Sequence, residues 1–326
     1  STTSIKGKIV KKVVLGIDIG GTNTVYGLVE KSGNIVFRGQ IPTFGHEPVE
    51  NLVIRFWEKV DSFLEAHPEC ELSGIGAGAP NGNHFTGLIQ NPPNLSWGDV
   101  DIVSILKEKF SCEIILTNDA NAAALGEKNY GIAKDMSDFI MITLGTGLGS
   151  GIFSGDNILY GHDSMAGEMG HLSIDQNGRK CSCGLRGCLE MYVSAKGIRK
   201  SVNELKVKNP DDTFIQSLPE KGLDGRVLDK AFDAGERAAI ELYQFTGEKL
   251  GIGLAQAATL LSPEAFIIYG GYSNAGERLL EPARRAMDEY LLSSHKGKIL
   301  ILQSSLPQSE AGIIGAASLI WSPRTV

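Results

Sequence analysis

Short apolar runs alternate along this chain with segments of helical hydrophobic spacing. The run VVLGIDIGG from Val13 ends in glycines, and two β-prone segments, TVYGLVE and NIVFRGQI, follow it. This pattern predicts three strands joined by tight turns. From Glu47 to Ala66 apolar residues recur at the spacing of an amphipathic helix, and Leu72 to Ala79 returns to a strand-like run. The alternation predicts an α/β fold.

The same alternation continues toward the C-terminal end. The further elements that we expect are a helix at 100–110, a strand at 112–117, a helix opening at Asn118 or Asp119, two helical stretches within 223–261, a strand at 265–271, a helix at 276–290, a strand at 299–302 and a final apolar helix at 311–321.

The segment FIMITLGTGLGSGIF from Phe139 repeats the layout of VVLGIDIGGTNTVYGLV. Placing Gly145 on Gly20 gives an offset of 125 residues (145 − 20), long enough for each copy to begin its own domain. Two short glycine-rich hairpins can also coincide by chance. Both turns, however, place Gly and Thr directly after a strand, where backbone amides can surround phosphate.

Composition narrows the class of protein. The 326 residues are 42% hydrophobic and 21% charged, as in globular proteins. The net charge of −7 argues against a broad nucleic-acid surface. No stretch approaches the roughly 18 apolar residues of a membrane helix, and the start, STTSIKGKIVKK, lacks the apolar core of a signal peptide. We therefore expect a soluble, cytoplasmic protein that binds neither nucleic acid nor membrane.

The two glycine-rich turns favour a phosphate ligand. Neither GxxxxGK[ST] nor GxGxxG occurs, so a P-loop enzyme and an ordinary dinucleotide-binding enzyme lose their main support. Asp18, two residues before the first turn, suits Mg²⁺ or its bound waters, although an aspartate that only hydrogen-bonds the turn explains it equally well. The residues expected to hold phosphates are Gly20, Gly21, Thr22 and Asn23 with Gly145, Thr146 and Gly147.

The segment LTNDANAAALGE places Asn118 and Asp119 at a strand-to-helix junction. Capping of the helix is the common role of such residues. In combination with the phosphate turns a second role arises, because phosphoryl transfer to an alcohol needs a carboxylate that accepts the hydroxyl proton. Asp119 is the candidate for that base, and Asn118 for contact with a neighbouring hydroxyl.

A cluster of one histidine and three cysteines predicts a metal site. Its members, His171, Cys181, Cys183 and Cys188, match the ligands of tetrahedral structural Zn²⁺. The alternative is a polar loop with three free thiols, which oxidation makes less favourable. Cys70 and Cys112 are expected to be ordinary core residues.

Two glutamates flank this cluster in the sequence. Glu168 lies three residues before His171, and Glu190 two residues after Cys188. A metal that holds those ligands also fixes the neighbouring carboxylates, which then serve as rigid acceptors for sugar hydroxyls. Isolated glutamates are more often solvated surface residues.

Together these segments resemble a known family. The motifs GIDIGGTN, GAGAPN, NDANAAALGE, TLGTGLGSGI, AGEMGH, CSCGLRGCLE and PQSEAGIIGAA occur in the order seen in the ROK family of bacterial sugar kinases and repressors, within the actin/hexokinase-like superfamily. The resemblance runs from about Val13 to about Ala317. It implies two actin-like (ribonuclease H-like) domains flanking a cleft, with the zinc loop in the second. The implied domains are 1–120 with about 308–326, and 121–307.

The resemblance also implies an activity. A glucokinase-like kinase of this family transfers the γ-phosphate of ATP, with Mg²⁺, to the sugar 6-hydroxyl, and is usually a homodimer with structural Zn²⁺. Asp119 is then the base, Gly270 and Gly271 lie near the nucleoside, and Asn94 contacts sugar. The remaining implied sugar ligands are Asn118, Glu168, His171 and Glu190.

Two departures from the family pattern leave the substrate open. Asn81 replaces the glycine that commonly closes the GxGxPG-like turn, and Tyr272 takes the third place of a frequent triple glycine. Glucose is the first choice, while another hexose or an N-acetylhexosamine, and polyphosphate as donor, stay open. A sugar-sensing repressor of the family is the alternative from another class; we disfavour it because the phosphate motif begins about a dozen residues from the start, without room for a DNA-binding domain.

Overall fold

The computed structural model describes residues 3–5, 8–93, 95–308 and 310–322, and its chain divides into two compact units. Unit 1 comprises Ser1–Asp135, Asn157–Ala166 and Ser305–Val326. Unit 2 comprises Met136–Asp156 and Gly167–Ser304. The expected division at residue 120 differs from this one, because the helix that begins at Asp119 packs against the C-terminal helix of unit 1.

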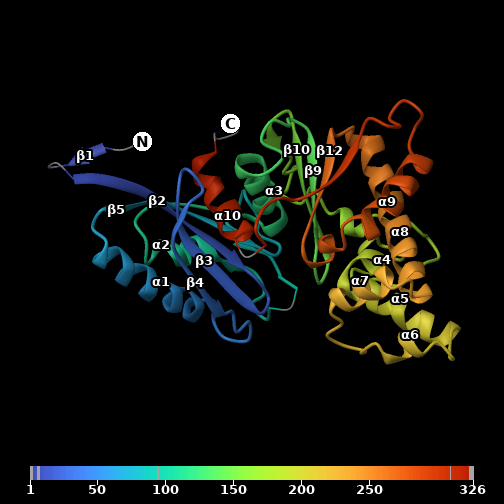
Figure 1. The fold of residues 1–326 in the computed structure, drawn as a ribbon. Helices are drawn as coiled ribbons and strands as arrows, with labels where there is room; N and C mark the ends of the chain where they lie inside the picture. Colours follow the sequence, from blue (N-terminus) through green and yellow to red (C-terminus); the bar gives the residue numbers. More distant parts are fainter. Residues whose placement is uncertain (1–2, 6–7, 94, 309, 323–326) are drawn as a thin grey trace. The chain divides into compact units, whose positions relative to one another are not determined.

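A mixed sheet forms the centre of unit 1 (Figure 1). Its strands run in the order β4–β3–β2–β5–β8, with β1 paired to β2. The strands are β1 (Thr3–Ile5), β2 (Lys8–Ile19), β3 (Asn23–Glu30), β4 (Ile35–Pro42), β5 (Cys70–Ala79) and β8 (Glu113–Asn118), and a separate pair is formed by β6 (Leu88–Ile89) and β7 (Val100–Asp101). The predicted three-strand meander is confirmed: β2 pairs antiparallel with β3, and β3 with β4.

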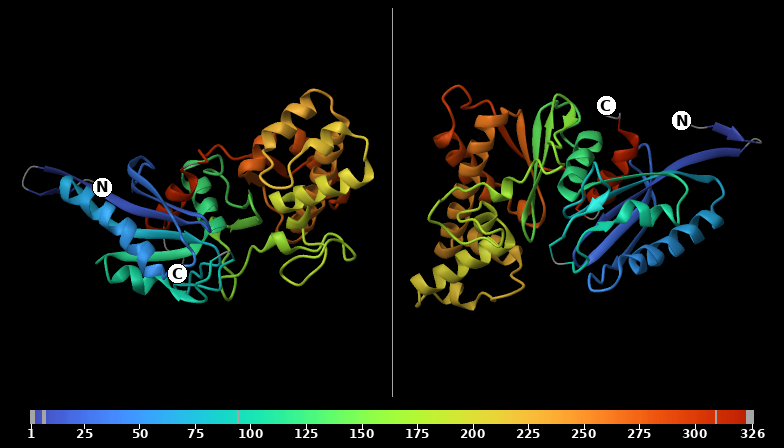
Figure 2. Two further views of the ribbon diagram at one scale, coloured as in Figure 1. Left: turned by 90° about the horizontal axis from the view of Figure 1, so that it is seen from below. Right: turned by 180° about the vertical axis from the view of Figure 1, so that it is seen from behind.

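Helices cover both faces of this sheet (Figures 1 and 2). The helices of unit 1 are α1 (Val49–Ala66), α2 (Ile102–Lys107), α3 (Asp119–Tyr130) and α10 (Ala311–Trp321). Alternate residues of β2, such as Leu15 and Ile17, pack with α1 and α2 in one core. Gly16 and Gly76 face α10, where a Cβ on either would collide with a carbonyl oxygen of that helix. Because alternate strand residues point to opposite faces, one face of the sheet packs against α1 and α2 and the other against α3 and α10.

The second sheet has the order β11–β10–β9–β12–β13, and all of its strands except β11 belong to unit 2. The strands are β9 (Phe139–Leu144), β10 (Leu148–Ser154), β11 (Asn157–Ile158), β12 (Ala265–Tyr269) and β13 (Leu300–Gln303). The helices are η1 (Met169–His171), α4 (Glu190–Val193), α5 (Ala195–Lys208), α6 (Thr213–Ser217), α7 (Gly225–Asp233), α8 (Arg237–Leu261), η2 (Gly271–Ala275) and α9 (Glu277–Tyr290). The Gly- and Ala-rich α8 packs closely on α9: Gly247 lies against Leu279 and Pro282.

The two sheets repeat one topology. In unit 1, β2 pairs antiparallel with β3 and parallel with β5, and β5 pairs parallel with β8. In unit 2, β9 pairs antiparallel with β10 and parallel with β12, and β12 pairs parallel with β13. The hairpin similarity in the sequence therefore corresponds to equivalent positions in two sheets.

The structure corrects one predicted element and adds others. The helix expected at 100–110 spans only Ile102–Lys107, because Val100 and Asp101 pair with β6 and the Asp101 carboxylate caps the helix by accepting the Ser104 N–H. Helices α4, α5 and α6 lie where the sequence predicted none. Within the described part of the chain, no helix is both long and apolar enough to cross a bilayer.

Candidate active site

The carboxyl ends of three parallel strands in unit 1 bring two acidic residues together. Asp18 of β2 is level with Gly78 of β5, and Gly78 is level with Thr117 of β8. Asp119 follows at the first position of α3. A Cβ on Gly78 would lie 3.5 Å from the Asp119 Cα, so the missing side chain leaves room at this edge.

The electrostatics of this edge are those of two crowded carboxylates. Burial, followed by the charge of Asp119, raises the pKa of Asp18 to about 7. Burial also raises the pKa of Asp119, although the Ala120 N–H, 2.9 Å from its Oδ1, acts in the opposite direction. Asp119 keeps accessible surface, so a small substrate can reach its carboxylate while nearby protein atoms limit its hydration. A raised pKa brings such a base closer to neutral pH, where proton transfer is most effective.

Asn118 is the N-cap of α3. Its Oδ1 accepts the Ala120 N–H at 2.9 Å, which confirms the capping role considered from the sequence. Because Asn118 occupies the cap, Asp119 is not required there and its carboxylate is available for other chemistry. Contact between Asn118 and a sugar stays a prediction.

The first predicted phosphate turn joins β2 to β3. The Gly20 N–H donates to the Asn23 carbonyl at 3.0 Å, and Gly21, Thr22 and Asn23 are exposed. Thr43, just after β4, holds the turn: its hydroxyl donates to the Gly20 carbonyl at 2.7 Å and its N–H to the Thr22 carbonyl at 2.8 Å. The turn is thus a fixed, solvent-facing loop, as a phosphate site requires.

The second predicted phosphate turn joins β9 to β10 in unit 2. Gly145 and Thr146 are exposed, and the Gly145 carbonyl accepts the Ala195 N–H at 2.9 Å. Gly270, at the end of the neighbouring β12, has φ 109° and lies against Leu144, where a Cβ would collide. The structure therefore brings the predicted nucleoside glycines, Gly270 and Gly271, beside this turn.

The four predicted zinc ligands converge in unit 2. Their donor atoms all lie within 4.8 Å of one another. The Cys181 Sγ is 3.8 Å from the His171 Nδ1, and the Cys183 and Cys188 Sγ atoms are 3.6 Å apart. Tetrahedral zinc with Zn–S bonds of about 2.3 Å separates its donors by about 3.8 Å. Burial, with the neighbouring thiols, raises the pKa of Cys188 to about 12, so this sulfur needs a cation to be a thiolate at neutral pH. The donor set and spacing fit Zn²⁺.

The two glutamates that flank the cluster in sequence lie near it. Glu190 begins α4, is 9% exposed, and its Oε1 lies 3.5 Å from the Cys181 Sγ. Its Oε2 would lie 3.0 Å from a Cβ on Gly147, so the second phosphate turn and Glu190 are neighbours. Glu168 precedes η1, which carries His171. Unit 2 thus gathers Glu168, His171 and Glu190 with the metal cluster.

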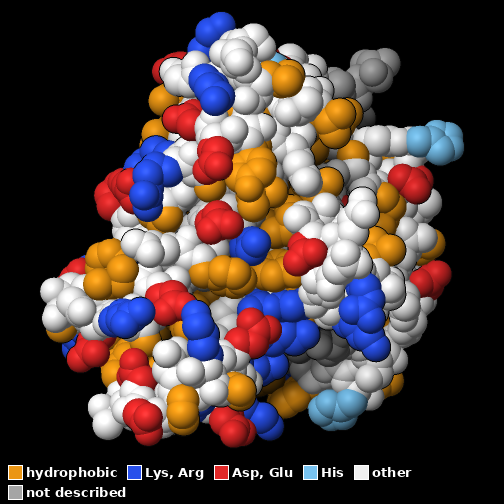
Figure 3. All heavy atoms as spheres, turned by 90° about the vertical axis from the view of Figure 1, so that its right-hand side faces the viewer, with side chains coloured by type: hydrophobic (Ala, Val, Ile, Leu, Met, Phe, Trp, Pro, Cys, Tyr) orange, Lys and Arg blue, Asp and Glu red, His pale blue; other side chains and the backbone are white. Residues whose placement is uncertain are grey.

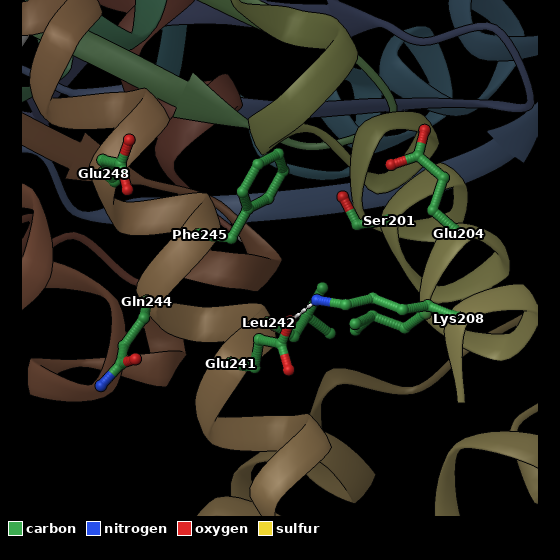
Figure 4. Close-up of a pocket in the computed structure, with 9 residues that line it drawn as sticks. Ser201, Glu204, Lys208, Glu241, Leu242, Gln244, Phe245 and Glu248 are labelled. Carbon is green, nitrogen blue, oxygen red and sulfur yellow. Dashed lines mark hydrogen bonds and ion pairs between the residues drawn. The ribbon is translucent and has the colours of Figure 1, made fainter. Parts of the chain in front are cut away.

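A separate cavity of about 370 Å³ lies between α5 and α8 and contains none of the predicted site residues (Figure 4). Its charged lining is paired within the protein: Lys208 contacts Glu241 at 2.9 Å, and Glu204 contacts Arg179. On the helical face of unit 2, charged side chains of both signs surround hydrophobic ones (Figure 3). The cavity therefore lacks the chemistry of the predicted site.

Sequence reasoning missed residues that act by being small or by supporting others. Gly312, in the first turn of α10, lies against the Asp18 carboxylate, where a Cβ would collide. Gly78 leaves room at the carboxylate edge because it has no side chain. Thr43 supports the first phosphate turn through its hydrogen bonds. The motifs GAGAPN and PQSEAGIIGAA contain both glycines, but only packing shows their contacts. Of the predicted residues, Asn94 lies outside the described part of the chain.

Comparison with known proteins places the chain in a family. The model of the ROK family matches residues 14–322. The chain belongs to the ROK family. The match to the family model confirms the resemblance seen in the sequence motifs. The match covers nearly the whole of this ROK protein.

Individual relatives of this ROK protein include enzymes and regulators. A glucokinase of Halalkalibacterium halodurans is 33% identical, over 94% of each chain. The crystal structure of a ROK family glucokinase from Streptomyces griseus in complex with glucose and AMPPNP has a TM-score of 0.79 and 29% identity, covering 94% of this chain and 98% of that one. A xylose repressor of Bacillus subtilis is 30% identical over 94% of this chain and 76% of its own length.

Proposed function

We propose that this ROK protein is an ATP-dependent hexose kinase, with glucose as its substrate, that transfers the γ-phosphate to the 6-hydroxyl. The observation that carries the proposal is the accessible Asp119 carboxylate, with its raised pKa, beside Asp18 at the strand ends. The relatives support it: proteins described as glucokinases match over nearly their full length at 31–33% identity.

In the proposed reaction Asp119 accepts the proton of the sugar hydroxyl. The hydroxyl oxygen forms the new bond to the γ-phosphorus, the bond from phosphorus to the β-phosphate oxygen breaks, and ADP leaves with that electron pair. The turns at 20–23 and 145–147 are each proposed to offer backbone N–H groups to phosphate. Asn118, Glu168, His171 and Glu190 are the proposed hydrogen-bonding partners of the sugar, and Asn94 a further one.

Two metal ions belong to the proposal. Asp18 and Asp119 form a carboxylate pair whose mutual repulsion a divalent cation relieves, which fits Mg²⁺. Mg²⁺ on the phosphates would neutralise charge that develops during transfer. Zn²⁺ on His171 and the three cysteines would be structural, since all four positions are filled by protein. A cytoplasmic location, a homodimer, the absence of nucleic-acid binding and two actin-like domains stay predictions.

The test is an ADP-release assay with Mg-ATP, zinc-replete protein and a panel of hexoses, xylose and N-acetylhexosamines. We expect glucose to give the highest kcat/KM, with a typical kcat of about 1–10³ s⁻¹. Absence of turnover with every sugar would refute the kinase. A higher kcat/KM for another hexose would refute glucose alone, and parallel assays with polyphosphate identify the donor.

The second candidate is a sugar-sensing protein, because a xylose repressor is also similar to this chain. Calorimetric titration with glucose and xylose separates the two. Sugar binding without turnover would favour a sensor, whereas turnover that requires Asp119 would favour the kinase.

A further inference from the structure

The hydroxyl of Ser150 lies between the two peptide groups that flank Glu168. The Ser150 Oγ donates to the Gly167 carbonyl, which belongs to the peptide before Glu168. The same Oγ accepts the Met169 N–H, which belongs to the peptide after it, at 3.3 Å. Ser150 is 4% exposed and lies within β10. One buried oxygen therefore bridges both sides of a proposed sugar-binding residue.

The backbone at Glu168 has a tight, specific shape. Its φ of −78° and ψ of 48° are near those of an inverse γ-turn, and the Met169 N–H donates to the Gly167 carbonyl at 2.9 Å. Gly167 has φ 96°, and a Cβ there would lie 2.7 Å from the Ser150 carbonyl oxygen. The turn is thus pressed against β10 at a position that only glycine tolerates, and Ser150 closes the contact.

This arrangement links the Glu168 turn to a regular element. β10 is hydrogen-bonded to β9 along its length, with Ser150 opposite Ile142. The segment from Gly167 to Leu189 contains the short η1 and two isolated bridges, at Ser173–Cys188 and Lys180–Arg186, so no strand ladder includes Glu168. Inverse γ-turns are themselves small units with one hydrogen bond. The Ser150 hydroxyl supplies two further bonds from a rigid strand.

We propose that Ser150 is a positioning residue for sugar binding, acting through Glu168. The hydroxyl fixes the turn, the turn sets the direction of the Glu168 side chain, and that direction determines how well the carboxylate meets the sugar. Ser150 itself does not contact the substrate. This inference rests on the proposed function and adds to it a residue that controls sugar affinity without taking part in proton transfer.

The test is Ser150→Ala, which removes one oxygen atom. We expect the KM and the calorimetric Kd for glucose to rise about tenfold, the order expected when two buried hydrogen bonds of a positioning group are lost. The kcat should stay within about threefold, because Asp119 belongs to another element, and the KM for ATP should not change. An equal rise in the KM for ATP, or a wild-type Kd for glucose, would overturn the inference.

A matched control is Ser201→Ala. Ser201 is 3% exposed and, like Ser150, donates one hydrogen bond and accepts one: to the Gly197 carbonyl at 3.2 Å and from Arg179 at 2.9 Å. Arg179 keeps its bonds to Glu204 and to the Met191 carbonyl. We expect thermal destabilisation similar to that of Ser150→Ala with unchanged glucose affinity. A similar loss of affinity in both variants would show that any buried hydroxyl has this effect and would overturn the inference.

A double-mutant cycle tests the route through Glu168. In a Glu168→Gln background, Ser150→Ala should change the glucose Kd by less than about twofold, because the group that it positions is already altered. A full tenfold effect in that background would overturn the inference.

If the Ser150→Ala variant unfolds, Ser150→Cys tests the inference in its place, because a thiol is a weak donor and acceptor. A rise in the glucose Kd that is smaller than the tenfold rise expected for Ser150→Ala supports the inference, and no rise overturns it. Wild-type protein without turnover on any sugar would instead overturn the proposed function.

Discussion

The candidate residues of unit 1 and unit 2 are held in place by different means. In unit 1, Asp18, Gly78 and Thr117 are level across three hydrogen-bonded strands, and Asp119 begins a helix. In unit 2, Glu168 and the cysteines belong to irregular backbone between β10 and α4. Unit 1 positions its groups through the register of a sheet, and unit 2 through individual contacts.

This difference determines which side chains matter. A strand ladder fixes the backbone without help from side chains, so substitution of Asp119 should change chemistry and little else. In irregular backbone, order comes from metal ligands, from glycines with positive φ such as Gly184 and Gly187, and from single hydroxyls such as Ser150. Loss of one such contact should loosen the sugar ligands and change affinity before it changes kcat.

The largest effect is expected from Asp119→Asn. The amide keeps the size of the side chain but cannot accept the hydroxyl proton, so kcat should fall by about 10²–10⁴-fold while the Kd for glucose changes little. Steady-state kinetics with calorimetry measure both. Asp101→Asn is the matched control, since Asp101 caps α2 in the same unit. A decrease of only a few-fold would assign Asp119 to a structural role.

A smaller effect, on affinity, is expected from Cys183→Ser. Elemental analysis should find about one zinc per wild-type chain, as for a single four-ligand site, and almost none in the variant. The KM for glucose should rise about 10–100-fold, by analogy with the loss of groups that orient a metal site, and more than the KM for ATP. Cys70→Ser, a thiol of unit 1, should keep its zinc. Normal glucose affinity in a zinc-free variant would limit the metal to local stability.

The smallest effect concerns the carboxylate pair of unit 1 and the stability of Mg²⁺-free protein. The pKa of Asp18 is about 7 when folded and near its ordinary value of 3.8 when unfolded, so between these values the native state binds more protons. This contribution to stability is therefore lost as pH rises from about 4 to 7. The side-chain amide of Asp18→Asn cannot ionise and therefore avoids this loss, so the Tm of the variant at pH 8 should exceed that of the wild type by roughly 3–8 °C. Solvent around the partly exposed carboxylate keeps the effect below its full value.

Melting curves at pH 5 and pH 8 measure this difference. The gap between variant and wild type should be larger at pH 8, and Mg²⁺ should narrow it by stabilising the ionised pair of the wild type. A gap that is independent of pH would show that Asp18 ionises with an ordinary pKa, and the contrast between the crowded edge of unit 1 and the metal cluster of unit 2 would weaken.

Much of the fold was predictable because its elements have strong local signals. The apolar run from Val13, the amphipathic spacing of 47–66 and the second run from Phe139 all form the expected elements. The metal cluster was predictable for a similar reason, since three of its ligands lie within eight residues. Helices α5 and α6 were missed because polar residues dominate their exposed faces, and they become ordered by packing into the core of unit 2.

The order of residues along the chain specifies which chemical groups are present and which elements carry them: the glycine-rich turns, Asp119 at a strand-to-helix junction, and one imidazole beside three thiols. Which of these groups meet depends on how distant elements pack together. Gly78 and Gly312 matter because a strand and a helix from distant parts of the chain approach Asp18 and Asp119 there. Ser150 matters because β10 lies beside a turn seventeen residues further on. A glycine or a serine has the same local preferences wherever it occurs, and its role depends on the neighbours that folding brings to it.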